Sequence, residues 1–431
     1  MRKNIMRNNK IIKNGLKIVL IIGLLVFPQP FIKAQVNQNQ QYLQKVGIVD
    51  SLYSQILGES RKIYIQLPVY FDEDHKYPVA FILDGEMFLP TVNDVQNYYS
   101  GGYTPEMILV GISNHKNRLR DLTTSTITTK YGMPFIGENG KADDFINYIE
   151  KELIPFIENK YPVTNFRTLI GHSYGALFAV YTLINHPSLF ANYLAIDPSL
   201  DWDNQKLLKE AQGLFGTQEY ENKSLFMSLG GQLHMQNSKI TIDNVMQDTT
   251  EFTLFARSNI AFSDMVVQNV KNGLSFEWKF YPKDIHGTIP FPSIMDGLIS
   301  LFEWYQMENT DKINSFDTPK EELLRIIRYR ANKLKTHFGY YEAPYPEELL
   351  NMSAYMNMDM QQLEKAKMYF ELAIEYYPKS ANALDSMADY YEIMGEFTKA
   401  IKYVNKAFKL SGNENYKERM EGLKAKMNNL D

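Results

Sequence analysis

The sequence predicts an α/β protein, built around a mostly parallel sheet and followed by a separate all-helical region. Up to about residue 307, short apolar runs typical of buried strands alternate with stretches typical of helices. Such alternation is typical of a parallel sheet that helices cover on both faces. Beyond residue 320 the strand patterns stop, and small residues recur at a constant interval. A length of 431 residues also favours two domains.

The strands expected in the first domain are apolar or alternating runs, and the expected helices are the longer segments between them. The strands cover residues 61–67, 79–83, 107–112, 168–170, 193–196, 224–229 and 275–281. The helices cover residues 145–160, 176–183, 205–211, 258–271 and 292–305. One connection, residues 113–144, is long, polar and rich in threonine. A loop of this length in a compact domain is usually functional or mobile.

The helical region repeats itself at a constant interval. Alanines recur at this interval in the pairs Ala354 and Ala388, Ala366 and Ala400, and Ala373 and Ala407. The interval equals the period of tetratricopeptide helix pairs, about 34 residues, and small residues in register are typical of them. We therefore expect repeats at residues 346–379 and 380–413, and a last helix at 416–427. A generic helical bundle is the alternative.

Residues 1–34 have the layout of a secretory signal peptide. A basic start is followed by the apolar run 18–27 and by Ala34, a small residue before the expected cleavage site. The run is too short to span a bilayer comfortably, so we expect export to the periplasm or medium without a stable membrane span. An uncleaved anchor is the alternative. The remaining boundaries are expected at 35–308 for the first domain, 309–320 for a linker and 321–431 for the helical domain.

Composition excludes several classes of function. The net charge of −5 and a charge pattern without a basic groove argue against a nucleic acid as the main partner. The chain has no cysteine, which excludes disulfides, thiolate zinc sites and cysteine nucleophiles. The hydrophobic fraction of 45% is ample for a sizeable core.

The segment Gly171-His172-Ser173-Tyr174-Gly175 lies between an expected strand and an expected helix. It matches the pattern Gly-x-Ser-x-Gly, which in this context forms a nucleophile elbow. The glycines allow a tight turn that leaves the serine hydroxyl exposed at a helix N-terminus. The pattern is weak by itself, and the strand and helix around it make Ser173 the candidate nucleophile. A coincidental glycine turn is the alternative.

A serine nucleophile needs a base and a group that orients the base. In a fold with this elbow the order is serine, then a carboxylate, then a histidine after the last strand. Of the seven histidines, His286 is the one on the loop directly after the last expected strand, so it is the candidate base. A histidine on a surface loop is the alternative.

The carboxylate is harder to assign. Its usual position follows the strand 224–229, but residues 230–237 contain no carboxylate. Asp197 ends the preceding strand and can approach the base from there, so we take it as the candidate acid. Other open assignments are a serine–histidine dyad without an acid, or one of Asp243, Asp248 and Asp284.

Two backbone N–H groups are expected to form the oxyanion hole. One belongs to Tyr174, directly after the nucleophile, and the other to Glu86, in the turn after the strand 79–83. Arg118 and Arg120 lie in the long polar connection and could bind an acidic group of a substrate. The structural alternative is a pair between Arg120 and Asp121 that fixes the loop, and it is slightly favoured.

Together these features resemble the putative-esterase family of α/β-hydrolases, which includes enterochelin (siderophore) esterases and proteins similar to S-formylglutathione hydrolase. The segments that carry the resemblance are Ile82-Leu-Asp-Gly-Glu86, Arg120-Asp-Leu-Thr123, Glu152-Leu-Ile-Pro-Phe-Ile157, Arg167-Thr-Leu-Ile-Gly-His-Ser-Tyr-Gly175, Asp197-Pro-Ser-Leu-Asp-Trp202, His286-Gly-Thr288 and Met295-Asp-Gly-Leu298. The resemblance covers about two-thirds of the chain. The sequence departs from the family at Ala176, often glycine, at Asp197, usually serine, and at Asp201, often a second aromatic residue.

The resemblance implies hydrolysis of a carboxylic ester through an acyl-enzyme. Ser173 and His286 match the family's catalytic pair, and Tyr174 and Glu86 match its oxyanion donors. The substrate would be a siderophore ester or a small acyl ester, with no metal or other cofactor. The repeats would bind a protein partner, a second copy or the catalytic domain. The alternatives are an inactive hydrolase-like scaffold that acts through its repeats, and acyl transfer or peptidase chemistry at the same site.

Overall fold

The computed structural model describes residues 46–130 and 132–429, and the chain from Val46 onward forms one compact unit. The predicted signal peptide lies outside the described residues. Within them, no helix is both long and apolar enough to cross a bilayer. No group of three or more histidine or carboxylate side chains in this part is placed to hold a metal ion.

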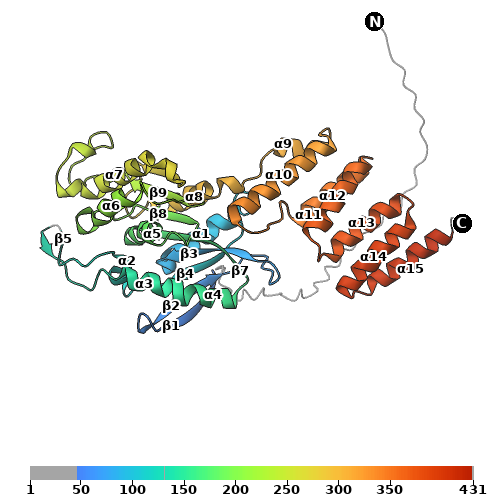
Figure 1. The fold of residues 1–431 in the computed structure, drawn as a ribbon, viewed down its shortest axis with the longest axis horizontal. Coiled ribbons are helices and arrows are strands. Elements are labelled where there is room, and N and C mark those ends of the chain that lie inside the picture. The colour runs from blue at the N-terminus through green and yellow to red at the C-terminus, as the bar shows by residue number, and fades with distance from the viewer. Residues whose placement is uncertain (1–45, 131, 430–431) are drawn as a thin grey trace, which may run out of the picture. The chain divides into compact units, whose positions relative to one another are not determined.

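An eight-stranded sheet forms the centre of the first domain (Figure 1), with the strand order β1-β2-β4-β3-β7-β8-β9-β10. The strands β1 and β2 run antiparallel to their neighbours, and the other pairs are parallel. The strands are β1 Ile48–Ser54, β2 Glu59–Gln66, β3 Tyr77–Leu83, β4 Ile108–Ile112, β7 Val163–His172, β8 Asn192–Ile196, β9 Ser224–Gly230 and β10 Ser275–Tyr281. The short strands β5 Thr129–Lys130 and β6 Met133–Pro134 form a separate hairpin. The predicted α/β class is confirmed.

Helices cover both faces of the sheet and bury a separate apolar core on each. The core on one face includes side chains of α3 Ala142–Tyr148, η1 Ile149–Leu153, α4 Ile154–Lys160, α5 Tyr174–Asn185, α6 Trp202–Leu214 and α7 Leu254–Gln268. The core on the other face includes side chains of α1 Gly85–Tyr99 and α8 Pro290–Leu301. The central strands β3, β4 and β8 are buried along their whole length, as expected for parallel strands covered on both sides.

The register of the parallel strands brings the predicted site residues to one edge of the sheet. His172 at the end of β7 pairs with Ile196 at the end of β8, and Ile196 pairs with Ser228 near the end of β9. The segments that follow β3, β7, β8, β9 and β10 therefore start side by side. Sites of parallel α/β proteins form at this carboxyl edge.

The helical region consists of antiparallel helix pairs with a core of its own. The helices are α10 Lys320–Phe338, α11 Glu347–Asp359, α12 Leu363–Tyr376, α13 Ala381–Ile393, α14 Phe397–Ser411 and α15 Asn415–Asn428. The alanines that recur with the repeat period are all fully buried, at 0% exposure for Ala354, Ala366, Ala373, Ala388, Ala400 and Ala407. They allow neighbouring helices to approach closely, which explains the period in the sequence.

Helix α10 belongs to both cores. Its first half places Leu323 and Ile327 in the core of the repeats, and its second half places Leu334 and Phe338 in the core beneath α1 and α8. The buried Arg330 between them donates to backbone carbonyl groups of Pro344 (2.7 Å) and Tyr305 (2.8 Å). The expected linker 309–320 contains the short helix α9 Thr310–Ile313. The domain boundaries themselves stay a prediction.

Some elements differ from the sequence-based expectations. The sequence pattern does not predict the edge strand β1, because most of its side chains are partly or fully exposed and polar residues interrupt the pattern. Helix α1 is not predicted either, since it contains Pro90 and begins at a glycine. The helix expected at 145–160 begins at Ala142 and includes the π-helical turn η1. The polar connection 113–144 contains the short helix α2 Arg118–Leu122.

A buried ion network attaches the connection 113–144 to strand β2, and its contribution to stability can be tested. Arg61 donates to Asp121 (2.6 Å) and Glu59 (2.9 Å), and the side chains of Arg61 and Asp121 are only 5% and 1% exposed. We expect Arg61→Met to lower the free energy of unfolding by about 3 kcal/mol, because it removes one cation from the buried carboxylate of Asp121. Urea unfolding measures this loss.

The matched control is Arg325→Met. The Arg325 side chain is 76% exposed, and its nitrogen lies 3.8 Å from Glu322. Loss of this exposed pair should change the free energy of unfolding by no more than about 0.5 kcal/mol. An equal loss in both variants would contradict the role assigned to the buried network.

Candidate active site

Ser173 occupies a strained turn between β7 and α5. Its backbone has φ 61° and ψ −115°, outside the regions that residues other than glycine normally adopt. The turn is so tight that a Cβ atom on Gly171 would lie 2.3 Å from backbone atoms of Gly175. Glycine is therefore required at position 171. The Ser173 side chain comes to the start of a helix at the carboxyl edge of the sheet, as the elbow pattern predicts.

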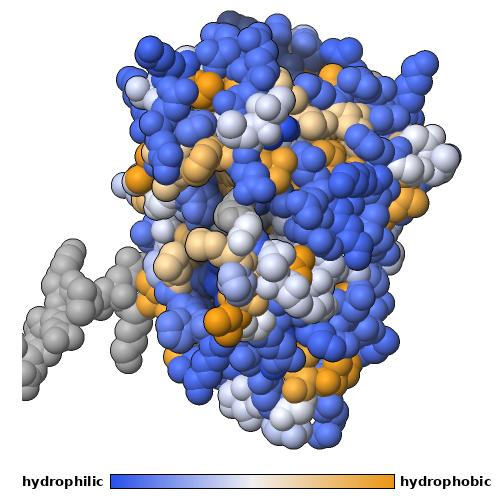
Figure 2. All heavy atoms as spheres, turned by 90° about the vertical axis from the view of Figure 1, so that its left-hand side faces the viewer, coloured by the Kyte–Doolittle hydropathy of each residue, from blue (hydrophilic) through white to orange (hydrophobic). Residues whose placement is uncertain are grey.

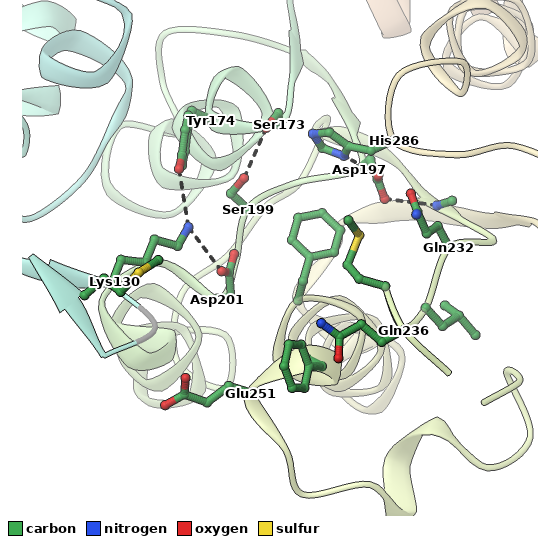
Figure 3. Close-up of a pocket in the computed structure, with 16 residues that line it drawn as sticks. Lys130, Ser173, Tyr174, Asp197, Ser199, Asp201, Gln232, Gln236, Glu251 and His286 are labelled. Atoms are coloured by element: carbon green, nitrogen blue, oxygen red, sulfur yellow. Dashed lines mark hydrogen bonds and ion pairs between the residues drawn. The ribbon is translucent and has the colours of Figure 1, made fainter. Parts of the chain in front are cut away.

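Asp197 and His286 are brought together from two different strands. Asp197 follows β8 and is 2% exposed, and its Oδ2 atom lies 2.6 Å from Nδ1 of His286 on the loop after β10. The other carboxylate oxygen accepts the backbone N–H of Gly230 at 3.0 Å. Figure 3 shows the His286 ring between Asp197 and Ser173. Nδ1–H thus faces the carboxylate, which leaves Nε2 to accept a proton.

The other carboxylates considered from the sequence have different surroundings. Asp284 accepts the hydroxyl of Thr288 at 3.0 Å, and Asp248 accepts hydrogen bonds from Thr250 and Thr253. No contact of His286 with Asp243, Asp248 or Asp284 is present among the residues that the structure describes. Of the candidate acids, Asp197 is the one that contacts the candidate base.

His172 supports the loop that carries His286. Its Nε2 atom lies 2.9 Å from the carbonyl oxygen of His286, and the two rings are 4.5 Å apart. Burial lowers the pKa of His172 to about 3, and the nearby His286 contributes to the shift. His172 is therefore neutral at ordinary pH, and its Nε2–H donates to the carbonyl of His286.

An ion pair connects the elbow to the turn after β3. Arg118 Nε lies 3.0 Å from each carboxylate oxygen of Asp84, and its terminal nitrogen donates to the carbonyl of His172 at 3.0 Å. Asp84 itself has φ 50° and precedes helix α1. Burial raises the pKa of Asp84, while Arg118 acts in the opposite direction. Arg118 thus connects His172, which precedes Ser173, to Asp84, which precedes α1.

The two predicted oxyanion donors lie in the first turns of helices. Tyr174 begins α5, and Glu86 is the second residue of α1. Backbone N–H groups in a first helical turn have no acceptor within the helix and are available to an anion. Both residues line cavities that Ser173 also lines.

Two cavities meet at Ser173 and His286. The larger has a volume of about 810 Å³ and the smaller of about 610 Å³. The larger is lined by Lys130, Met133, Ser173, Tyr174, Asp197, Ser199, Asp201, Gly230, Gln232, Leu233, Met235, Gln236, Glu251, Phe252, Phe255 and His286. Figure 3 shows this cavity. A pocket of this size can enclose a ligand as large as a typical drug molecule.

The structure places Arg120 outside both cavities. Its guanidinium binds Glu59 (2.6 Å) and Asp121 (2.8 Å), and its side chain is 15% exposed. These contacts are those of the structural alternative, in which the arginine fixes the loop. The residue of this segment that reaches the site is Arg118, which lines the smaller cavity.

Sequence reasoning did not identify several residues of the site. Ser199 Oγ lies 3.3 Å from the hydroxyl of Ser173. Lys130 Nζ lies 3.3 Å from Asp201 and 5.3 Å from the centres of the Tyr174 and Trp202 rings. Lys130 comes from the threonine-rich connection, whose length was the only signal that it could reach the site.

Comparisons with known proteins agree with this fold. Residues 54–253 match the model of the family described as putative esterase, and residues 347–380 and 381–414 match the tetratricopeptide repeat. The predicted repeats are thereby confirmed, with each boundary shifted by a single position.

The chain is similar to two curated siderophore esterases. It is 28% identical over 203 residues to the ferri-bacillibactin esterase BesA of Bacillus subtilis, covering 43% of this chain and 70% of the relative. It is 30% identical over 179 residues to the siderophore enterobactin esterase of Emericella nidulans, covering 39% of this chain and 59% of the relative. The match thus spans between about three-fifths and seven-tenths of these relatives.

Two solved structures share the fold over more of the chain. An IroE-like serine hydrolase from Shewanella oneidensis has a TM-score of 0.62 and 26% identity, covering 77% of this chain and 99% of the other. An uncharacterised protein from Capnocytophaga ochracea has a TM-score of 0.57 and 19% identity, covering 88% of this chain and 99% of the other. Residues 54–253 are thus similar to the putative esterase family, and two tetratricopeptide repeats follow them in the chain.

Proposed function

We propose that the protein is a serine esterase that hydrolyses a carboxylic ester through an acyl-enzyme. The observation that carries the proposal is the contact of 2.6 Å between His286 Nδ1 and the buried Asp197, beside Ser173 on a strained elbow. A serine at such a turn, with an oriented imidazole next to it, has what acyl transfer requires. The family supports esterase chemistry in general.

In the proposed reaction, Ser173 Oγ attacks the carbonyl carbon of the ester as His286 Nε2 takes the hydroxyl proton. The Tyr174 and Glu86 N–H groups stabilise the oxyanion, and Asp197 stabilises the imidazolium. The carbon–oxygen bond of the ester then breaks, and His286 gives the proton to the leaving alcohol. Water, activated by His286, attacks the acyl-enzyme and releases the acid and Ser173.

For the substrate, the cellular location and the partners, we propose classes only. Relatives named as siderophore esterases support a siderophore ester, and a small acyl ester uses the same chemistry. The signal pattern of residues 1–34 supports export. The tetratricopeptide helices support binding of a protein partner. The contact of Asp197 with His286 weakens the alternative of an inactive scaffold, which a missing acid would favour.

The first test of this function is Ser173→Ala. We expect the parent protein to hydrolyse p-nitrophenyl acetate and the variant to lose at least about 1,000-fold in kcat, because the acyl-enzyme cannot form. Release of p-nitrophenol measures the rate, and circular dichroism checks folding. Ser51→Ala, at an exposed edge-strand position, is the control and should keep full activity. No Ser173-dependent turnover on any ester would favour the scaffold.

The second test is Asp197→Asn. The amide would present its N–H to Nδ1 of His286 and thereby favour the tautomer that cannot act as the base, so we expect kcat to fall by about 1,000- to 10,000-fold. Asp284→Asn, on the same loop as His286, is the matched control and should retain activity within about threefold. A large loss in the control with none in Asp197→Asn would transfer the acid role to Asp284.

A third prediction concerns the pH dependence of stability through His172. The unfolded chain takes up a proton at this histidine near its ordinary pKa of 6.5, and the folded chain does so only near 3. Between these values the unfolded state binds more protons, so stability falls as pH decreases. From pH 7 to pH 5 this residue should contribute about 2 kcal/mol to the loss.

Urea unfolding of the parent and of His172→Gln at both pH values measures this contribution. The variant cannot take up the proton, so its loss of stability from pH 7 to pH 5 should be smaller than that of the parent by the predicted amount. His115→Gln, at an exposed position, is the control and should leave the pH dependence as it is in the parent. An identical pH dependence in the parent and His172→Gln would show that the folded chain protonates His172 as readily as the unfolded chain.

A further inference from the structure

Helix α14 presents a row of positively charged side chains to water. Its exposed lysines form this lysine row, which consists of Lys399, Lys402, Lys406 and Lys409. Neighbours in the row are three or four residues apart, so all of them lie on one face of the helix. The buried residues of α14 lie on the opposite face, and the helix packs between α13 and α15 (Figure 1). The lysine row is therefore on the solvent side of the second repeat.

Helix α14 contains no carboxylate, unlike its neighbours. Each of the helices α10, α11, α12, α13 and α15 carries two or three Asp or Glu residues. Several lysines near these residues are paired with them, as Lys424 is with Glu421 at 2.7 Å. In the lysine row, Lys399 contacts Glu396 at the start of α14. No ion pair of the other three is present in residues 46–130 and 132–429.

The charges of the second repeat are separated. The carboxylates of α13 contact Arg419 of α15, and these carboxylates are Asp385, Asp389 and Glu392. The lysines of α14 are instead next to one another, and like charges at this spacing on a helix repel each other. The repulsion is relieved when negative charge covers the row. The lysine row therefore favours an anionic partner.

The type of residue in the row indicates the kind of anion. All of its cations are lysines, whose ammonium group is a point charge on a flexible stem and lacks the fixed fork with which arginine binds a single carboxylate or phosphate. Leu410 lies on the same face beside the row and is 45% exposed. Mobile positive charges next to an exposed apolar side chain fit a surface of diffuse negative charge, such as the head groups of an anionic membrane.

The exposed apolar side chains of the hydrolase domain have a different setting. Figure 2 shows them around hollows on the face that carries β5 and α7. Apolar groups that gather around a hollow fit a ligand that enters it. The exposed carboxylate of Glu251 lines the larger of these cavities and would be repelled by an anionic surface. Between these two faces, the lysine row is the one that suits an anionic membrane.

We propose that the lysine row is a docking face for an anionic membrane surface, where it contacts the phosphate groups of acidic phospholipids. The chain has a net charge of −5, so such a surface repels the chain as a whole and attracts it only at a local positive face. Binding through the row would therefore hold the second repeat in one orientation. An acidic segment of a protein is the competing partner.

The experiment measures binding to vesicles by co-sedimentation. It uses the chain from Gln35, which omits the predicted signal peptide, itself basic and apolar, and retains the whole compact unit from Val46 onward. We expect binding to vesicles of phosphatidylglycerol and phosphatidylcholine in equal amounts, and none to pure phosphatidylcholine. Raising the NaCl concentration from about 0.1 M to about 1 M shortens the screening length from about 10 Å to about 3 Å and should release the protein.

The row variant combines Lys399→Gln, Lys402→Gln, Lys406→Gln and Lys409→Gln. A lysine close to an anionic surface contributes about fivefold to binding, so the row variant should bind the vesicles at least about 50-fold more weakly than the parent. Glutamine is a good helix former, and circular dichroism checks that the helices are retained. Hydrolysis of p-nitrophenyl acetate should stay as in the parent, because none of these lysines lines the cavities at Ser173.

The matched control combines Lys76→Gln, Lys206→Gln, Lys239→Gln and Lys271→Gln. These lysines are exposed on the hydrolase domain, and the control has the same net charge as the row variant. It should bind the vesicles within about threefold of the parent. An equal loss in both variants would show that net charge rather than the lysine row decides binding, and would overturn the proposal.

A further arm separates lipid from protein partners by the use of soluble polyglutamate. Row-dependent binding of polyglutamate without binding of vesicles would overturn the proposal in favour of an acidic protein segment. Binding of neither would reject an anionic partner for the lysine row. Displacement from vesicles by soluble glycerophosphoglycerol, the free head group, would show a discrete head-group pocket and would also contradict docking on an extended surface.

Discussion

The buried carboxylate of Asp197 is the constraint on which the candidate site depends. A carboxylate that is 2% exposed must have its charge balanced by hydrogen bonds or an opposite charge. Its two oxygens meet this requirement from two directions, with the Gly230 N–H at 3.0 Å and His286 Nδ1 at 2.6 Å. These contacts offset the cost of burying the carboxylate, and the contact with Nδ1 also fixes the orientation of the His286 ring.

The parallel register explains why an acid on β8 can replace the acid expected after β9. Ile196 pairs with Ser228, so the end of β9 lies directly beside Asp197. The position that would carry the acid is occupied by Gly230, whose N–H binds the carboxylate from the neighbouring strand. A side chain at Gly230 would meet Asp197 and the backbone of Asp284 at about van der Waals distance, at 3.5 Å and 3.4 Å. A small residue at position 230 therefore leaves room for the contact between Asp197 and the loop that carries His286.

Much of this could be predicted from the sequence, because the signals were local. The elbow needs glycines at fixed positions around Ser173, and buried parallel strands are continuous apolar runs, so both were visible. The position of His286 followed from the order of the strands. Asp197 was the candidate acid, but the sequence left other carboxylates open, because the contact depends on the register of β8 and β9. For Arg120, the sequence indicated the pair with the adjacent Asp121 but not the pair with Glu59, which lies 61 residues away in the chain.

The polar groups around Ser173 and the apolar lining of the larger cavity differ in how firmly they are held. Hydrogen bonds of 3.0 Å or less, made by Arg118, His172 and Asp197, connect the elbow, the turn after β3 and the loop that carries His286. Such connections keep catalytic groups in place at a small entropic cost during the reaction. In the larger cavity, which Ser173 and His286 also line, exposed methionine and phenylalanine side chains form part of the lining, and such side chains can repack around different ligands. The polar groups around Ser173 are therefore fixed by specific contacts, whereas the apolar lining beside them is adaptable.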